Sequence, residues 1–135
     1  MPTPPKKTVK AVCAAIFDDE GRFFAAKRDY GFLRGYFEFP GGKIEAGETS
    51  FRAIEREIEE ELSTAVKAIR SLGKVEYDYP DFRLDMEVIE CKVESGRLSL
   101  HEHIHSEERF FRLDEADKAL FCPADCLVID LLGSK

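Results

Sequence analysis

Apolar and polar positions follow patterns that divide the chain into strands and helices. Residues 9–17 form a dense apolar run with β-branched side chains, which is typical of a buried strand. A polar turn follows at 18–21, and the apolar run 22–28 returns from it, so the two runs predict a hairpin. The stretch 29–42 is rich in glycine and aromatic residues and predicts a loop with a short strand at 36–39.

The pattern changes to a helical period after Thr49, which is placed to act as an N-cap. Apolar residues at helical spacing predict a core-facing stripe formed by Phe51, Ile54, Ile58 and Leu62.

The rest of the chain continues with strands and ends with helices. Along the run 82–94, Leu84, Met86 and Val88 alternate onto one face, as expected of a strand. The later elements are strands at 65–80 and 82–94, a turn at 95–97 into the segment 98–105, another strand at 109–113, and helices at 114–120 and 124–132. This order predicts a mixed sheet between helices, an α/β/α sandwich of the α+β class. We expect a single domain over residues 1–135, with 1–7 as a flexible lead-in.

Composition and charge narrow the possible partners. The chain is 44% hydrophobic and 35% charged, which is globular composition, and its net charge of −7 argues against binding nucleic acid polymers. A phosphate-bearing small molecule stays compatible if cations hold it. No apolar run approaches the ~18 residues of a membrane span, so we expect no membrane association and a cytoplasmic location.

Four cysteines are scattered along the chain, and two of them lie inside apolar runs. This distribution predicts buried free thiols, because no second close pair accompanies Cys122 and Cys126 to form a zinc site.

Five of the seven residues from 55 to 61 are glutamates. At about 100° per residue, Glu57, Glu60 and Glu61 fall within about 100° of arc, beside the apolar stripe. A solvated acidic face is the ordinary interpretation of such a run. Carboxylates at the edge of a buried face are costly unless a cation lies among them, however, and hard cations such as Mg²⁺ or Mn²⁺ prefer these oxygens.

The segment 42–64 resembles the Nudix box, G-x5-E-x7-R-E-U-x-E-E-x-G-U, in which U is a bulky aliphatic residue. The two departures are Ser63 and Thr64, which replace the late glycine and the last aliphatic. Because both follow the ligand positions, they affect the helix exit more than the chemistry. The matching positions are Gly42, Glu48, Arg56, Glu57, Ile58, Glu60 and Glu61.

The resemblance assigns roles to these positions. It implies a Mg²⁺ or Mn²⁺ site formed by Glu57, Glu60 and Glu61 with the Gly41 carbonyl. Arg56 would position the glutamates by ion pairing, and Glu48 and Gly42 would support the junction between loop and helix. Glu57, Glu60 and Arg56 are thus the catalytic candidates in the box.

The family's MutT-like branch adds a glutamate from a later loop as a further metal ligand or base. We assign it to Glu102, with Glu107 and Glu108 as alternatives. His101, His103 and His105 alternate nearby and would share a face of a strand, which leaves open a transition-metal site or the rim of a nucleotide cleft.

Segments outside the box also resemble the MutT-like branch and imply substrate contacts. Arg28 matches a phosphate-contacting arginine, and Phe39 matches a phenylalanine that lines the nucleotide. Tyr79 matches an aromatic position, and Asp125 matches the residue that touches the base. An ionised Asp125 could accept from the amine of cytosine, whereas a protonated one could also read an oxidised guanine.

The resemblance implies metal-dependent cleavage of a nucleoside triphosphate to the monophosphate and pyrophosphate. CTP, dCTP and modified cytosine triphosphates are the first expected substrates, and 8-oxo-dGTP is a close second. Sanitation of the nucleotide pool is the expected role, in a monomer or a homodimer. Two alternatives stay open. One is hydrolysis of ADP-ribose or another nucleoside diphosphate derivative, suggested by Pro80 downstream of the box. The other is a Nudix-fold nucleotide-binding module without catalysis.

Overall fold

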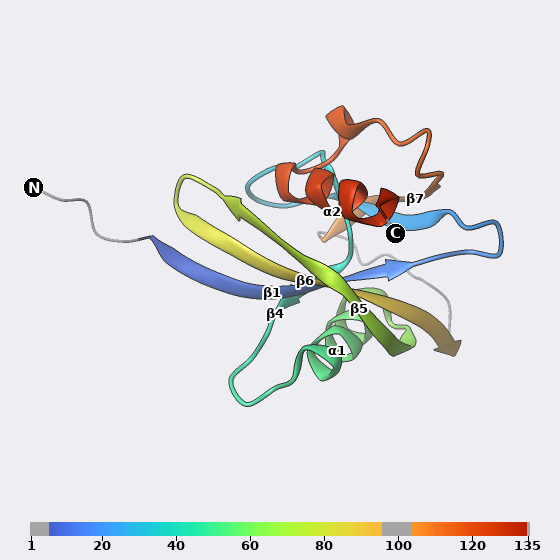
Figure 1. The fold of residues 1–135 in the computed structure, drawn as a ribbon, viewed down its shortest axis with the longest axis horizontal. Coiled ribbons are helices and arrows are strands. Elements are labelled where there is room, and N and C mark those ends of the chain that lie inside the picture. Colours follow the sequence, from blue (N-terminus) through green and yellow to red (C-terminus); the bar gives the residue numbers. More distant parts are fainter. Residues whose placement is uncertain (1–5, 96–103, 135) are drawn as a thin grey trace, which may run out of the picture.

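The described part of the chain folds into two β-sheets with two α-helices and a short 3-10 helix, and their arrangement can be followed in Figure 1. The computed structural model describes residues 6–95 and 104–134. In chain order the elements are β1 (Lys7–Ile16), β2 (Phe23–Arg28), β3 (Phe37–Glu38), β4 (Gly41–Lys43), α1 (Ser50–Leu62), β5 (Ala65–Asp78), β6 (Phe82–Ser95), β7 (His105–Phe111), the 3-10 helix η1 (Lys118–Leu120) and α2 (Pro123–Gly133).

The larger sheet has the strand order β4-β1-β6-β5 and is mixed. Strand β1 runs parallel to β6 and antiparallel to β4, while β5 and β6 form a long antiparallel pair. The smaller sheet has the order β3-β2-β7 and is antiparallel. The α+β class with a mixed sheet is confirmed, but the strands divide between two sheets.

This division changes the expected hairpin of the first two apolar runs. The turn between β1 and β2 is present, and Phe17 and Phe23 form an isolated antiparallel bridge beyond it. After that bridge the two strands diverge, since β1 belongs to the larger sheet and β2 to the smaller one.

The helices cover opposite faces of the larger sheet (Figure 1). The buried side chains of α1 include Ile54, Ile58 and Leu62, and they pack in one cluster with Val12 and Ile89. Those of α2 belong to a second cluster with the other faces of β1 and β6. Burying each such aliphatic side chain stabilises the fold by about 1.5–3 kcal/mol. The alternation of Met86 and Val88 onto one face is confirmed, because both belong to the second cluster.

Two predicted features are wrong in detail. Phe51 is 37% exposed, and Ala53 is buried in its place. Phe51 has the right angular position but belongs to the first turn, and periodicity does not tell where a helix begins to cover a sheet. The helix expected at 114–120 is only η1, where the Asp117 side chain accepts a hydrogen bond from the Ala119 amide. Pro123 follows closely and disfavours helical backbone before it.

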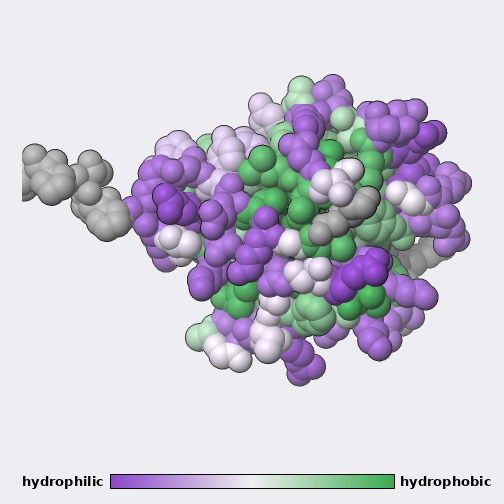
Figure 2. All heavy atoms as spheres, in the orientation of Figure 1, coloured by the Kyte–Doolittle hydropathy of each residue, from purple (hydrophilic) through white to green (hydrophobic). Residues whose placement is uncertain are grey.

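The cysteines match the prediction, since all four are free and Cys13, Cys91 and Cys122 are buried. Within the described ranges 6–95 and 104–134, no helix has the length and apolar content needed to cross a membrane. Figure 2 shows a face on which polar and charged residues dominate the outline, with hydrophobic residues concentrated near the middle.

Candidate active site

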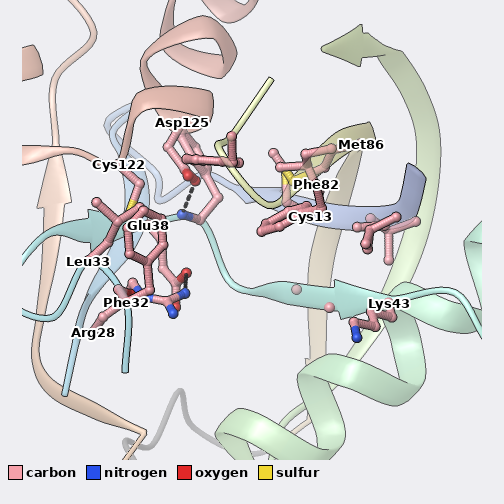
Figure 3. Close-up of a pocket in the computed structure, with 18 of the residues that line it drawn as sticks. Cys13, Arg28, Phe32, Leu33, Glu38, Lys43, Phe82, Met86, Cys122 and Asp125 are labelled. Atoms are coloured by element: carbon pink, nitrogen blue, oxygen red, sulfur yellow. Dashed lines mark hydrogen bonds and ion pairs between the residues drawn. The ribbon is translucent and has the colours of Figure 1, made fainter. Parts of the chain in front are cut away.

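A pocket of about 410 Å³ opens between the two sheets and the start of α2 (Figure 3). It is lined from β1, β3, β4 and β6, from the loop 29–36, and from the first turn of α2. Arg28, Phe39, Tyr79 and Asp125, which the sequence predicted as substrate contacts, all line it. Residues nearly one hundred positions apart in the chain therefore meet in one cavity, and their roles remain predictions.

Asp125 lies at one end of the pocket and is 7% exposed. Its Oδ1 accepts a hydrogen bond of 2.8 Å from the Phe39 amide, a contact drawn in Figure 3. Burial, and then the charge of Glu38, raise the pKa of the Asp125 carboxyl to about 8. The group is therefore mainly protonated at neutral pH and can donate a hydrogen bond.

Tyr79 connects the loop after β5 to the same end of the pocket. Its hydroxyl oxygen accepts a hydrogen bond of 3.2 Å from the Ala124 amide, in the first turn of α2. Cys122, at the N-cap position, makes no side-chain capping bond, so Tyr79 satisfies a helix amide that would otherwise lack a partner.

Glu38 joins Arg28 to His105 in a chain of contacts that the sequence did not predict. The Glu38 carboxylate accepts a hydrogen bond of 2.8 Å from Arg28 Nη1, and its other oxygen lies 3.0 Å from His105 Nε2. The His105 side chain is fully buried, and its Nδ1 lacks a hydrogen-bond partner among the described residues. Arg28 also donates to the Phe32 carbonyl and lies over the Tyr30 ring, so its guanidinium is held firmly at the pocket.

The two glycines of β4 bring the backbone close to its neighbours. A Cβ at Gly41 would lie 2.0 Å from the Val12 carbonyl oxygen on β1. A Cβ at Gly42 would lie 2.4 Å from the carboxyl carbon of Glu57. Neither position has room for a side chain as the structure stands. At Gly42 the space that a Cβ would need is occupied by the carboxylate of Glu57 on α1.

Arg56 lies at the centre of an ion-pair network between α1 and β4. Its guanidinium donates to Glu48 at 2.7 and 2.9 Å, to Glu57 at 2.9 Å and to Glu60 at 3.1 Å. It also donates to the Lys43 carbonyl at 3.1 Å, which ties α1 to β4. The arginine lowers the pKa of Glu48 to about 2. These are the ion pairs expected of a residue that positions the glutamates.

Glu61 is the most buried of the three predicted metal ligands. Burial, and then the charges of Glu38 and Glu57, raise the pKa of its carboxyl to about 8. Its Oε2 is buried without a hydrogen-bond partner among the described residues. Burial also raises the pKa of Glu57, although Arg56 opposes the shift. Two partly desolvated carboxylates thus lie close to one another beside β4.

The Nudix domain family matches residues 7–128 of the chain. The chain belongs to the Nudix family. The 8-oxo-dGTP diphosphatase of Proteus vulgaris is 36% identical over 77 residues, which are 56% of this chain and 69% of that protein. The 8-oxo-dGTP diphosphatase of Escherichia coli (strain K12) is 33% identical over 76 residues, 56% of this chain and 59% of that protein. Apart from the Proteus vulgaris protein, the chain spans 53% to 59% of the length of the curated relatives that it matches.

Solved structures agree with this assignment. The MutT Nudix hydrolase of Burkholderia pseudomallei is 26% identical, with a TM-score of 0.81 over 94% of this chain and 99% of that one. The MutT protein of Methanosarcina mazei Go1 shares the fold, with 18% identity and a TM-score of 0.83 over 98% of this chain and 95% of that one. The protein is a MutT-like Nudix hydrolase, an enzyme of the pyrophosphohydrolase class.

Nudix hydrolases generally use a divalent metal, and the residues of this site fit one. Glu57 and Glu61 supply hard oxygen donors, the orphaned Oε2 of Glu61 lacks a partner, and Gly42 leaves room for the Glu57 carboxylate. Among residues 6–95 and 104–134, no three Asp, Glu, His or Cys side chains already surround one point. Mg²⁺ suits such a site, because it binds one or two carboxylates and completes its shell with water and substrate phosphates.

Several predicted residues lie away from the pocket or outside the described ranges. Glu107 is on β7 and pairs with Lys27 and Arg109, and neither Glu107 nor Glu108 lines the pocket of the Nudix domain. Glu102, His101 and His103 lie outside the described residues. The metal site that these histidines could share with His105 therefore stays a prediction. Glu38 was missed because a single glutamate between two phenylalanines gives no pattern to detect.

Proposed function

We propose that this MutT-like Nudix hydrolase converts a nucleoside triphosphate to the monophosphate and pyrophosphate, and that 8-oxo-dGTP is its preferred substrate. One observation carries the proposal: a single pocket extends from the buried carboxyl of Asp125 to the β4 strand that lies against Glu57. A base held at Asp125 would direct its phosphates towards the acidic helix. The diphosphatase activity of the relatives supports the same reaction.

The cations of the pocket are placed to receive the phosphates. Arg28 and Lys43 line it from β2 and β4, at the side where the glutamates of α1 lie. A divalent cation bound by Glu57 and Glu61 would stabilise charge on the phosphate oxygens and lower the pKa of bound water. The Arg56 network would hold Glu57 in position during the reaction. Phe39 and Tyr79 line the pocket and are buried, and their rings would exclude water from the base.

The protonation state of Asp125 favours guanine over cytosine. Because Oδ1 already accepts from the Phe39 amide, the other oxygen is left to carry the proton at neutral pH and would meet the base as a donor. A donor there matches the O6 acceptor of guanine, whereas the exocyclic amine of cytosine needs an acceptor. CTP and dCTP are the second candidates, since the ionised carboxylate would accept from that amine.

A nucleotide panel tests the proposal. Pyrophosphate release would be measured for 8-oxo-dGTP, dGTP, CTP, dCTP and ADP-ribose, with Mg²⁺ and with a chelator. We expect the highest kcat/KM for 8-oxo-dGTP, monophosphate as the nucleoside product, and no turnover with the chelator. Preference for ADP-ribose would favour the nucleoside diphosphate alternative, and binding without any turnover would favour a non-catalytic module.

A further inference from the structure

The loop 29–36 carries three exposed aromatic side chains. Tyr30 and Tyr36 are each 41% exposed, and Phe32 is 59% exposed. Tyr30 lies under the Arg28 guanidinium, 4.2 Å from it, and Tyr36 does not line the pocket. Phe32 lines the pocket and leaves more than half of its surface uncovered, so it is the aromatic of this loop whose role is unexplained.

The backbone of the loop is built to hold Phe32 at the rim. Gly31, Leu33 and Gly35 have φ values of 51°, 65° and 92°, and Leu33 adopts this left-handed conformation although it has a side chain. The Phe32 carbonyl accepts a hydrogen bond of 3.0 Å from Arg28 Nε, and the Gly35 amide donates one of 2.9 Å to the Arg28 carbonyl. The loop is therefore fastened to the residue predicted to contact phosphate.

The Phe32 ring contacts Tyr79, whose hydroxyl binds the first turn of the helix that carries Asp125. Its centroid is 5.8 Å from that of Tyr79, and the two ring planes are 86° apart. The two rings meet edge to face and do not stack on each other, and Phe32 is 59% exposed, so surface of its ring is available to a third ring. Figure 3 shows Phe32 and Leu33 beside Arg28, on the other side of the view from Phe82 and Met86. Tyr79 in turn binds the helix turn that carries Asp125.

We propose that Phe32 is the stacking platform for the nucleobase and a determinant of purine preference. The inference rests on the proposed function, which places the base at Asp125. Any base can stack on an aromatic side chain, but the stacking energy increases with the overlap of the rings. The larger guanine ring system should therefore bind more tightly to Phe32 than cytosine does. A base stacked on Phe32 would cover the apolar surface that this ring leaves exposed at the rim of the pocket.

The test compares Phe32→Ala with Tyr36→Ala, a control in the same loop and outside the pocket. KM and kcat would be measured for 8-oxo-dGTP and dCTP, and the Kd of 8-oxo-dGMP and dCMP by calorimetry without turnover. Phe32→Ala should raise KM and Kd for the guanine nucleotides roughly tenfold, and less for cytosine, with kcat nearly unchanged. Phe32→Tyr and Phe32→Trp should restore binding, and Tyr36→Ala should match the wild type.

Other outcomes would overturn the inference. Unchanged Kd values in Phe32→Ala would do so, as would equal losses in Tyr36→Ala, since these would mean only a loosened loop. Lack of rescue by tyrosine and tryptophan would also exclude stacking. If the wild type binds these monophosphates through Phe32 but hydrolyses no triphosphate, the proposed function fails and the platform stands. If the wild type binds no nucleoside monophosphate, the platform fails as well.

Discussion

At the scale of single residues, the site is distinguished by carboxyl groups that are largely buried and lie near one another. Asp125, Glu38 and Glu61 interact through their charges, and burial is the largest cause of the raised pKa values of Asp125 and Glu61. The charge of Glu38 therefore contributes to the raised pKa of both Asp125 and Glu61. A substitution at Glu38 should change how these two carboxyls titrate.

The first prediction concerns Asp125 and pH. Its carboxyl loses the proton as pH rises through about 8, and with it the donor for guanine O6. The ratio of kcat/KM for 8-oxo-dGTP over dCTP should therefore fall on the order of tenfold between about pH 6.5 and about pH 9. Taking the ratio cancels the titration of the phosphates and of the metal site, which both substrates share.

Asp125→Asn provides the matched control, because its amide donates at every pH. The same ratio in this variant should stay nearly constant across the range. A ratio that depends on pH equally in both proteins would show that Asp125 does not read the base, and the substrate would then be an unspecified nucleoside triphosphate.

Sequence reasoning reached some of these residues and missed others for physical reasons. Arg28, Phe39, Tyr79 and Asp125 were found from a resemblance, and the fold brings them into one pocket. Glu38 and His105 were not assigned these contacts, because their pairing depends on β2 lying between β3 and β7. The charge state of Asp125 depends on burial, which no local pattern reports.

At the scale of elements, α1 shows what a pattern can and cannot predict. Thr49 caps the helix as expected, accepting a hydrogen bond from the Arg52 amide, and three of the four predicted core positions are buried. Periodicity fixes the angle of a side chain around the helix axis. Whether a given turn lies over a sheet, as with Phe51, depends on tertiary packing. The division into two sheets was missed because it requires knowing the pairing of distant strands.

The second prediction concerns the end of α1. Ser63 is the C-cap and adopts the left-handed conformation, with φ 51° and ψ 38°. Glycine accepts this conformation without the steric cost of about 1–2 kcal/mol that a side chain brings, although it loses more entropy on folding. Ser63→Gly should raise the free energy of unfolding by up to about 1 kcal/mol and leave kcat/KM unchanged. Denaturant unfolding and the pyrophosphate assay check this, and a clear loss of stability would contradict it.

The third prediction separates the two glycines of β4. A Cβ at Gly42 meets the movable end of the Glu57 side chain, whereas a Cβ at Gly41 meets the β1 backbone. Gly42→Ala should therefore fold with nearly normal stability and lose at least about tenfold in kcat/KM, because a displacement of 1 Å can cost far more. Gly41→Ala should be destabilised by about 1–3 kcal/mol or more. Thermal melts alongside activity distinguish the two, and equal behaviour of both variants would contradict the geometry.

At the scale of the whole molecule, metal binding should be visible in stability as well as in activity. A cation that binds the folded chain stabilises it by about 1.4 kcal/mol at ten times its Kd, which corresponds to a few degrees in Tm. Mg²⁺ should therefore raise Tm in the wild type and much less in Glu57→Gln. Glu59→Gln, on the exposed face of the same helix, should behave as the wild type. Equal Mg²⁺ shifts in all three proteins would remove Glu57 from the ligand set.

Other expectations at this scale remain predictions. These are the single domain over 1–135, the monomeric or dimeric state and the cytoplasmic location. Size-exclusion chromatography with light scattering would determine the oligomeric state directly.

The parallel pairing of β1 with β6 has a consequence for the order in which the chain folds. Five elements separate the two strands in the chain, namely β2, β3, β4, α1 and β5. Pairings between such distant segments form slowly, because a long loop must close before any contact compensates for the lost entropy. On the ribosome, β1 leaves the tunnel well before its partner exists. The wall that β1 and β6 contribute to the pocket therefore forms late, and a nascent chain released before β6 has no binding site to protect it.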